Sequence, residues 1–183
     1  DIINNTFIGI DDASSIEAIY IYSTVNTDFV DIVNNIFYNL HKIIDNDSSD
    51  EFNLSFNDFY DISGELIEGT SPDGLGNYAF ENQNGTPIDL YNNISQDPLF
   101  VDVLNGDYQL QEGSLCINAG DPDILDEYGN PSDIGAFSQY CNGFVDCAGV
   151  CNGDAVEDCA GECNGDAVFD ECDLCDGPGL NEE

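Results

Sequence analysis

The chain contains no arginine, methionine or tryptophan, and Lys42 and His41 are its only basic side chains. Against the one lysine stand 38 acidic residues, so the 183-residue chain has a formal net charge of -37 at pH 7. Nucleic acids and anionic membrane surfaces bind proteins through clustered Lys and Arg, and we expect neither as a partner. Repulsion of this size opposes a compact state unless counterions bind. The charge therefore fits high salt or the divalent cations found outside cells.

Long apolar runs and helical periodicity are also missing. No run approaches the roughly 18 apolar residues of a membrane-spanning helix, so we expect no membrane insertion. No segment sustains the apolar period of about 3.6 residues that marks an amphipathic helix. Asp1 begins inside what reads as a strand, and we expect the chain to be a piece of a longer secreted precursor.

The first third of the chain repeats a pattern in which Asn precedes Phe by two residues, after a short β-prone run. The aligned pairs are Asn5 and Phe7, Asn35 and Phe37, and Asn57 and Phe59. Steps of roughly 20 to 30 residues indicate stacked coils and not a packed sandwich. We expect the Asn amides to hydrogen-bond from coil to coil, at corners where Asn tolerates the left-handed backbone conformation. We expect the Phe rings to point inward and stack on one another.

Residues 92–139 carry four linked motifs in a fixed order. They are Asp97–Asp102 (DPLFVD), Gly106–Leu110 (GDYQL), Gly113–Pro122 (GSLCINAGDP) and Asp133–Phe137 (DIGAF). Together they resemble the final turns of right-handed parallel β-helix proteins of the pectate-lyase-like group, found on many bacterial secreted and surface proteins. Leu115 departs from the pattern, because the group often has Pro there. The resemblance implies an all-β fold: a right-handed parallel β-helix, or solenoid, over residues 1–140, followed by an irregular disulfide-rich tail over residues 141–183.

Scaffolds of this group often carry polysaccharide lyases and hydrolases, so catalysis must be weighed. Lyases of this fold need a basic residue and cationic groups, and this chain offers only His41 and Lys42, which we expect to be solvated loop residues. The related hydrolases use clustered Asp motifs. Asp11-Asp12 and Asn26-Thr27-Asp28 occur here in the wrong order, and His41 lacks flanking glycines. We therefore expect no catalytic residues and no enzyme activity.

The last quarter of the chain repeats with a period of 12 residues, from Cys147 to Cys159 and from Cys151 to Cys163. It has almost no large apolar residues, so disulfides or bound cations must hold it. Oxygen-bearing side chains recur on alternate residues, which suits a hard cation such as Ca²⁺. The candidate Ca²⁺ ligands are Asn152, Asp154, Asp158, Asn164, Asp166 and Asp170.

This tail loosely resembles the calcium repeats of thrombospondin type 3, although it lacks their Asp-x-Asp-x-Asp-Gly core. An acidic linker held only by disulfides is the alternative to a Ca²⁺-binding tail. The loop over Asp121–Asp133 is a further Ca²⁺ candidate, although its Gly comes too late for an EF-hand.

The eight cysteines, in an acidic chain poor in His, predict disulfides and an extracellular or cell-surface location. Structural zinc is the alternative, but only Cys172 and Cys175 have the usual Cys-x2-Cys spacing. We expect Cys116 to pair with Cys141 and so join the tail to the β-helix. The other six would pair within the tail: Cys147, Cys151, Cys159, Cys163, Cys172 and Cys175.

These observations predict a non-catalytic extracellular structural protein, a segment of a secreted or cell-surface protein. We expect self-association, with head-to-tail contacts that build a filament stabilised by Ca²⁺ and disulfides. The alternative is a glycan-binding or adhesin module, which would bind a polysaccharide through exposed aromatic side chains. The candidate aromatics are Tyr20, Tyr22, Tyr38 and Tyr60. A carbohydrate-active enzyme is the second alternative, and converging Asp side chains would be its mark.

Overall fold

The computed structural model describes residues 1–9, 17–21, 29–46, 52–82, 84–139, 141, 144–170 and 174–175. The chain divides into two compact units, unit 1 (Asp1–Tyr140) and unit 2 (Cys141–Glu183). The described residues contain no α-helix, and among them no helix is long and apolar enough to cross a membrane. The predicted all-β class, with parallel strands and a disulfide-rich tail, is confirmed.

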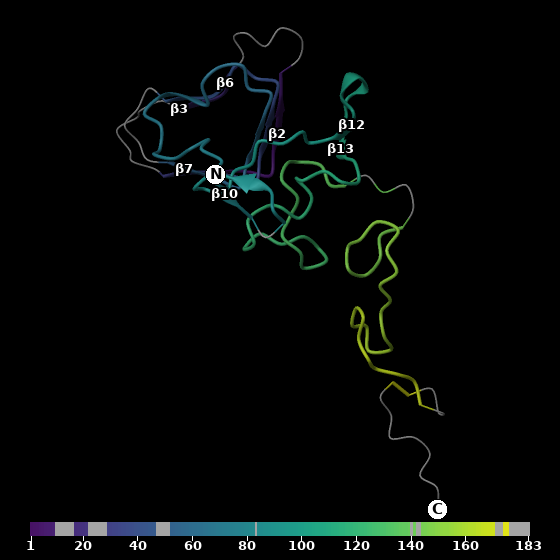
Figure 1. Ribbon diagram of the computed structural model, residues 1–183. Coiled ribbons are helices and arrows are strands. Elements are labelled where there is room, and N and C mark those ends of the chain that lie inside the picture. Colours follow the sequence, from purple (N-terminus) through teal and green to yellow (C-terminus); the bar gives the residue numbers. More distant parts are fainter. Residues whose placement is uncertain are drawn as a thin grey trace, which may run out of the picture. The chain divides into compact units, whose positions relative to one another are not determined.

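Nine short strands of the described chain form three parallel sheets. The first sheet joins β1 (Ile2–Ile3), β4 (Val30–Val33) and β7 (Phe52–Ser55); the second joins β2 (Thr6–Ile8), β5 (Ile36–Tyr38) and β8 (Asp58–Tyr60); the third joins β3 (Glu17–Ile21), β6 (Lys42–Asn46) and β9 (Ile67–Gly69). Each sheet thus takes one strand from each of three successive passes of the chain. We call the passes with β1–β3, β4–β6 and β7–β9 coils 1, 2 and 3. In Figure 1, β3 and β6 lie along one side of the coils, with β7 and β2 along two others.

The register of these sheets places equivalent residues above one another. In the second sheet, Phe7 pairs with Phe37, and Phe37 pairs with Phe59. In the first sheet, Ile2 pairs with Ile32. Because successive side chains of a strand point to opposite faces, one row of each sheet enters the coils and the next row points outward. The repeated sequence pattern therefore places like side chains in rows that run from coil to coil.

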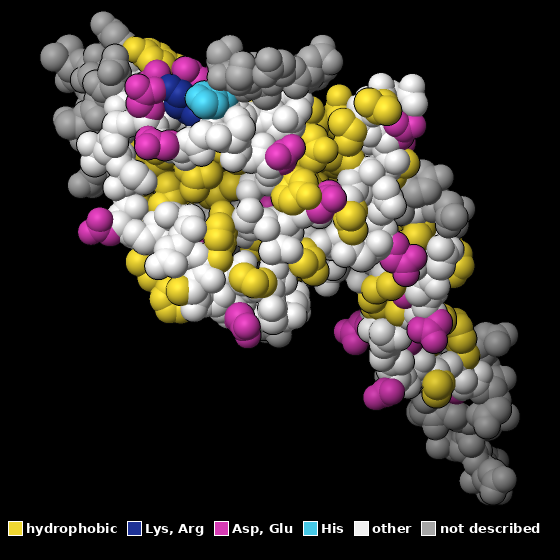
Figure 2. Space-filling model, turned by 45° about the horizontal axis from the view of Figure 1, so that its top comes forward, with side chains coloured by type: hydrophobic (Ala, Val, Ile, Leu, Met, Phe, Trp, Pro, Cys, Tyr) yellow, Lys and Arg dark blue, Asp and Glu magenta, His cyan; other side chains and the backbone are white. Residues whose placement is uncertain are grey.

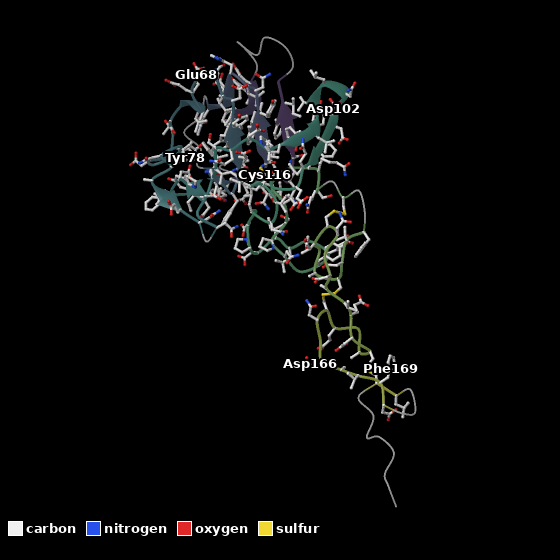
Figure 3. The ribbon with its side chains drawn as sticks, turned by 45° about the vertical axis from the view of Figure 1, so that its right-hand side comes forward. Glu68, Tyr78, Asp102, Cys116, Asp166 and Phe169 are labelled. Carbon is white, nitrogen blue, oxygen red and sulfur yellow. A yellow bond between two sulfur atoms is a disulfide. The ribbon has the colours of Figure 1, made fainter. Side chains whose placement is uncertain are left out.

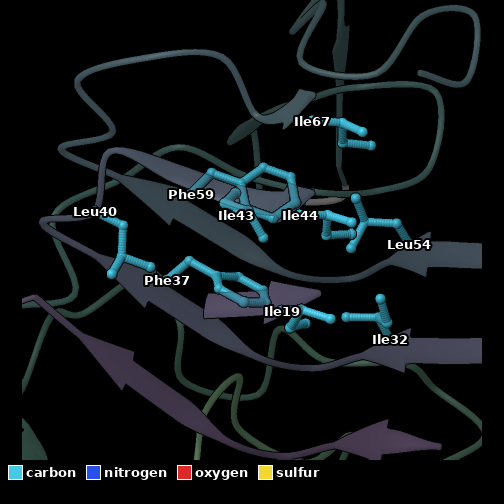
Figure 4. Close-up of a cluster of buried hydrophobic side chains, with 9 residues drawn as sticks. All are labelled: Ile19, Ile32, Phe37, Leu40, Ile43, Ile44, Leu54, Phe59 and Ile67. Atoms are coloured by element: carbon cyan, nitrogen blue, oxygen red, sulfur yellow. The ribbon is translucent and has the colours of Figure 1, made fainter. Parts of the chain in front are cut away.

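Apolar side chains from all three sheets fill the inside of the coils. Phe7 and Phe37 stack with their ring centroids 4.9 Å apart and their planes 3° from parallel. Phe37 and Phe59 are 5.7 Å apart and tilted by 42°. Such ring pairs contribute roughly 0.5–1.5 kcal/mol beyond the area they bury. Figure 4 shows the buried side chains of this cluster: Ile19, Ile32, Phe37, Leu40, Ile43, Ile44, Leu54, Phe59 and Ile67.

A second layer covers the outer face of the second sheet. It consists of the antiparallel pair β12 (Phe100–Asp102) and β13 (Asp107–Leu110), with the 3-10 helix η1 (Val103–Asn105) at the turn, and of the segment 114–137. The motifs that resemble the end of a β-helix supply most of this layer. The buried side chains between sheet and layer are Ile36, Ile88, Ile94, Phe100, Leu110, Cys116 and Ile134.

The glycine of the DIGAF motif is required by this packing. Gly135 has a φ of 104°, and a Cβ there would lie 2.7 Å from Ile36 Cδ1 and 3.0 Å from Thr6 Oγ1. Its N–H donates to Asn34 O at 2.8 Å. The next N–H, of Ala136, donates to Thr6 Oγ1 at 2.9 Å. The motif thus fastens the end of unit 1 against coils 1 and 2.

The stretch over residues 68–84 is partly regular. Its first two residues complete β9, and its later part contains β10 (Phe80–Glu81). This strand pairs antiparallel with β11 (Pro87–Ile88), with Phe80 opposite Ile88. The segment after coil 3 therefore leads to Asp89 and Asn93, which end the row of asparagines described below.

Candidate functional sites

A row of asparagine side chains runs through the three coils, between the first and second sheets. Asn5 donates its N–H and its Nδ2 to Asn35 Oδ1, at 2.9 and 3.1 Å. Asn35 donates the same two groups to Asn57 Oδ1, at 2.9 and 3.0 Å. Asn35 Nδ2 also donates to Ile2 O and Val33 O, both at 2.9 Å. The three asparagines aligned from the sequence thus form one ladder, which binds the coils through side chains as well as strands.

The ladder continues beyond the residues found in the sequence. Asn57 donates its N–H and Nδ2 to Asn93 Oδ1, at 2.8 and 3.0 Å. The same two groups of Asn93 donate to the Asp89 carboxylate at 2.9 to 3.2 Å. Asp89 also accepts the N–H groups of Tyr91 and Gly76, each at 2.9 Å. A carboxylate therefore ends the row.

The left-handed residue at each corner is the one before the ladder asparagine, so the corner role predicted for the ladder residues is wrong. The φ angles are 54° at Asn4, 57° at Asn34, 54° at Phe56 and 61° at Asn92. The left-handed residue that bends the chain thus precedes the ladder asparagine by one position. The ladder residue that follows can then align its N–H and its side chain with the next coil.

Lys42 is the chain's one lysine, and its predicted place in a solvated loop is wrong. It begins β6, is 9% exposed, and its Nζ lies 3.1 Å from Glu17 Oε1 and 3.7 Å from Asp45 Oδ2. Glu68 Oε2 is a third partner, and the hydrogen bond to it is the main cause that raises the pKa of Lys42. Figure 2 shows the lysine among acidic side chains, beside the histidine. A lysine held protonated in this way cannot act as a Brønsted base.

His41 directly precedes β6 and is half-buried. Its Nδ1 lies 3.2 Å from Ser63 Oγ. A Cβ on Gly64 would lie 2.8 Å from the His41 Cε1 atom, so the backbone of coil 3 packs closely against the ring. The imidazole therefore fills space between two coils.

Asp58 is buried between coil 3 and the second layer. In the outward row of the second sheet it stands between Ile36 and Ile94. Its Oδ1 accepts the Gln96 N–H at 2.9 Å, and the Cys116 Sγ lies 3.4 Å from its Oδ2. Burial raises the pKa of Asp58 to about 8, so the carboxyl group is mostly protonated at pH 7. The sequence analysis did not single out this residue.

The predicted Cys116–Cys141 disulfide is wrong. Cys116 is a free, buried thiol of unit 1, labelled in Figure 3, and Cys141 pairs with Cys151. Burial, together with the neighbouring Asp58, raises the pKa of the Cys116 thiol well above its usual value. Because the thiolate is the reactive form of cysteine, this thiol is inert. The Asp58–Cys116 pair packs two layers together and supplies no nucleophile.

Unit 2 consists of small hairpins that repeat at the 12-residue period. Their antiparallel bridges join Val145 to Cys151, Glu157 to Cys163 and Phe169 to Cys175. At the first turn, Asp146 Oδ1 accepts the N–H groups of Ala148 and Val150 at 3.0 and 2.9 Å, and Oδ2 accepts that of Ala155 at 2.9 Å. One carboxylate thus closes the turn and holds the chain that leaves it.

Asp158 repeats this arrangement one period later. It accepts the N–H groups of Ala160, Glu162 and Ala167 at 2.9, 2.9 and 3.0 Å. The N–H of Glu162 is the main cause that lowers the pKa of Asp158, as the N–H of Val150 does for Asp146. Both carboxylates are therefore structural parts of the repeat.

Three disulfides connect the hairpins. They join Cys141 to Cys151, Cys147 to Cys163, and Cys159 to Cys175. The last two share a separation of 16 residues, so a turn cysteine of one hairpin bonds to a strand cysteine of the next. Cys172 lies outside the described residues. The six bonded cysteines cannot bind zinc, and their bonds indicate that the protein matures in an oxidising compartment.

The predicted Ca²⁺ ligands stay a prediction. Among the described residues, no three His, Cys, Asp or Glu side chains converge as a metal ion requires. Asp158 is occupied by backbone N–H groups, as described above. Asn152 and Asn164 have φ angles of 52° and 54°, so the chain turns at both residues. In the loop over Asp121–Asp133, Asp126 likewise accepts backbone N–H groups, at 2.9 Å.

The described candidates for glycan binding, Tyr20, Tyr38 and Tyr60, lie on two different sheets. Tyr20 lies on β3 and is 54% exposed, whereas Tyr38 and Tyr60 lie on the second sheet. Tyr38 and Tyr60 begin an aromatic row that crosses the second layer through Phe100, Tyr108 and Phe137, with successive ring centroids 5.5 to 6.0 Å apart.

Besides Cys172, three sequence-derived candidates lie outside the described residues: Tyr22, Asp11-Asp12 and Asn26-Thr27-Asp28.

We compared the chain with known proteins in three ways. No protein-family model matches it, no curated protein matches it, and no solved structure matches it.

Proposed function

We propose that the chain is a non-catalytic structural module of a secreted or cell-surface protein, built as a right-handed parallel β-helix with a disulfide-linked tail. The observation that supports this most is the use of its polar side chains. The ladder asparagines and the turn aspartates all bind backbone groups or one another. Side chains used in this way maintain the shape of the chain and do not converge on a substrate.

The arrangement of the strands supports the β-helix. Each of the three sheets takes one parallel strand from each coil, and the ladder keeps equivalent residues in register. Crossovers between parallel strands of one sheet are right-handed in about 98% of cases. We assign the coils this hand for the same reason.

The disulfides support a place outside the cell. Such bonds persist in secreted and surface proteins and are rare where glutathione keeps thiols reduced. Each would stabilise unit 2 by roughly 2–4 kcal/mol, mainly by restricting the unfolded chain. A unit with so little apolar core needs that contribution.

The chemistry of the described side chains argues against catalysis. Lys42 is held by three carboxylates. Asp58 and Cys116 face each other in an apolar cluster, and burial keeps both in their neutral forms. None of these three side chains is a free base or an accessible nucleophile.

Two measurements test this function. An antibody against the chain should label intact cells of the source organism or detect the protein in their medium, with the three disulfides formed in peptide maps. The purified chain should release no reducing ends and no unsaturated uronates from a polysaccharide panel. A reduced, cytosolic protein would contradict the location, and cleavage that survives repurification would contradict the structural role.

Glycan binding is the second candidate, and the aromatic row favours it. Phe137, at the end of this row, is 42% exposed, and sugars stack on exposed aromatic rings. Binding to a glycan array that is lost in Phe137→Ala and retained in Phe144→Ala would establish this candidate. Phe144 is a suitable control because it is 63% exposed and belongs to unit 2.

A further inference from the structure

The geometry points to the open edge of coil 1 as the docking surface for one further parallel β coil with an asparagine at the ladder position. We infer that this coil comes from a different stretch of polypeptide, and not from the far end of a second copy of this chain. The inference rests on the proposed β-helix and adds the chemistry of its partner.

The strands of coil 1 are the outer strands of their sheets. β1, β2 and β3 each have a neighbour on one side only in the part of the chain that the structure describes. Unpaired strand edges are templates for another strand. The burial of the phenylalanine row also indicates an open edge at coil 1. Phe7 is half-buried, whereas Phe37 and Phe59 in the same row are 0% and 2% exposed. The row of stacked rings is thus uncovered at its coil 1 end.

The ladder is open at this same edge. Oδ1 of Asn35 and of Asn57 each accept two hydrogen bonds from the coil before. Asn5 uses its N–H and Nδ2 as donors, but no described donor reaches its Oδ1. Beside it, Asn4 Oδ1 is buried without a hydrogen-bond partner. Asn5 Oδ1 is therefore an unused acceptor at this edge, so the missing partner must supply donors.

The hydrogen bonds of the ladder define the groups that this partner must supply. A coil seated on coil 1 would donate the N–H and the Nδ2 of its own asparagine to Asn5 Oδ1, as each coil does to the next. Its backbone carbonyl would accept the Thr6 N–H, as Asn5 O accepts the Ile36 N–H at 2.9 Å. A ring two residues after that asparagine would cover Phe7, as Phe7 covers Phe37.

The opposite end of the ladder, beyond coil 3, cannot act as this partner coil. There the ladder ends on Asp89, whose carboxylate accepts from Asn93, Tyr91 and Gly76 and has no N–H to pass on. Next to the ladder, coil 3 is also covered: Phe56 N donates to Tyr91 O at 3.1 Å, and Phe59 N donates to Ile94 O at 3.0 Å. At the ladder position a second copy would bring covered backbone groups and acceptors to a surface that needs donors. Head-to-tail growth by identical copies therefore does not continue this ladder.

The test adds one coil to the full chain. A copy of residues 30–52 is joined directly before Asp1, so that the copied Asn35 precedes Asn5 by the same 22 residues that separate Asn35 from Asn57. We expect hydrogen exchange at the Thr6 N–H to slow by roughly tenfold or more, the effect of one new hydrogen bond in a folded strand. The matched control carries Asn35→Asp in the copied coil only. It keeps the backbone but loses the Nδ2 donor, and the protection of Thr6 should disappear.

Each other outcome overturns a distinct part of the inference. Unchanged exchange at Thr6, or equal protection by the Asp control, would refute the asparagine-bearing coil. Loss of protection at Ile36 would refute it as well, because an added coil should not disturb coil 2. Without the added coil, oligomers that grow with concentration in sedimentation and protect Thr6 would show that a second copy is the occupant. Fast exchange at Asn35 and Asn57 in the unmodified chain would instead refute the β-helix itself.

Discussion

Left-handed corner residues are mostly asparagine in this chain, and Leu99 is an exposed exception. Its φ is 54° and its exposure is 38%. Crowding between Cβ and the carbonyl oxygen costs roughly 1–2 kcal/mol at such a residue, and Asn tolerates the conformation better. We expect Leu99→Asn to raise the free energy of unfolding by about 1 kcal/mol in urea titrations. Leu104→Asn is the control, because Leu104 is 97% exposed without a left-handed φ and should change little. Equal effects of the two substitutions would contradict this explanation.

Asp58 makes the stability of unit 1 depend on pH. Its pKa is raised from 3.8 to about 8, so between these values the folded state holds a proton that the unfolded state has lost. The free energy of unfolding should therefore fall as pH rises through this window, by up to about 1.4 kcal/mol per pH unit, and level off above it. Urea titrations followed by near-UV circular dichroism would measure the slope.

The control for this pH dependence is Asp58→Asn, which removes the titrating proton. We expect a shallower slope in this variant; Asp133, whose pKa burial also raises, would still contribute in the same direction. A slope as steep as that of the unmodified chain would mean that other groups carry the effect.

The sequence predicted residue roles where a pattern repeats and missed them where it does not. Asn5, Asn35 and Asn57 were found because Phe follows each by two residues. Asn93 was missed because Ser95 stands where that Phe would be, although an Asn precedes it as in coils 1 and 2. Asp58 was missed because nothing local distinguishes it among 38 acidic residues. Its burial is set by a layer that arrives much later in the chain.

In the hairpin of unit 2 that Asp158 closes, two glycine substitutions separate the effect of a steric clash from that of backbone strain. A Cβ on Gly165 would clash with the Asp158 carboxylate, whereas one on Gly161 would meet nothing within 4 Å although its φ is 84°. Gly165→Ala should displace the carboxylate from the turn and lower the yield of the Cys159–Cys175 disulfide on refolding. Gly161→Ala should cost only backbone strain, about 1 kcal/mol, and keep the bond. Peptide mapping after oxidation measures both. The same yield from both variants would show that this carboxylate does not organise the hairpin.

The elements also show why the cysteine pairing could not be derived from the sequence. Eight cysteines allow about 105 connectivities, and a repeat permits bonds within a hairpin or between hairpins equally well. The observed separation of 16 residues follows from the turn that Asp146 and Asp158 close, which places a turn cysteine beside the next hairpin. Lys42 was misplaced for a similar reason: Glu17 and Glu68 reach it only through the pairing of β3, β6 and β9.

At the scale of the whole molecule, the net charge of -37 makes cations act as counterions. Because counterions screen this repulsion, we expect the melting temperature to rise with NaCl and with Mg²⁺. A melting temperature that does not rise with NaCl would contradict this. A further, saturable rise with Ca²⁺ alone, reversed by EDTA in high salt, would establish the predicted Ca²⁺ site. An equal rise with Ca²⁺ and Mg²⁺ at matched ionic strength would mean that both ions act only as counterions.

An asparagine ladder holds the coils in register. Native-state hydrogen exchange by NMR tests it most directly, at the backbone N–H groups of Asn35 and Asn57, which donate to the side chains of Asn57 and Asn93 at 2.9 and 2.8 Å. The ladder predicts that both exchange as slowly as the amides of β5 and β6, since they open only when the coils separate. Exchange as fast as in an exposed turn would contradict it.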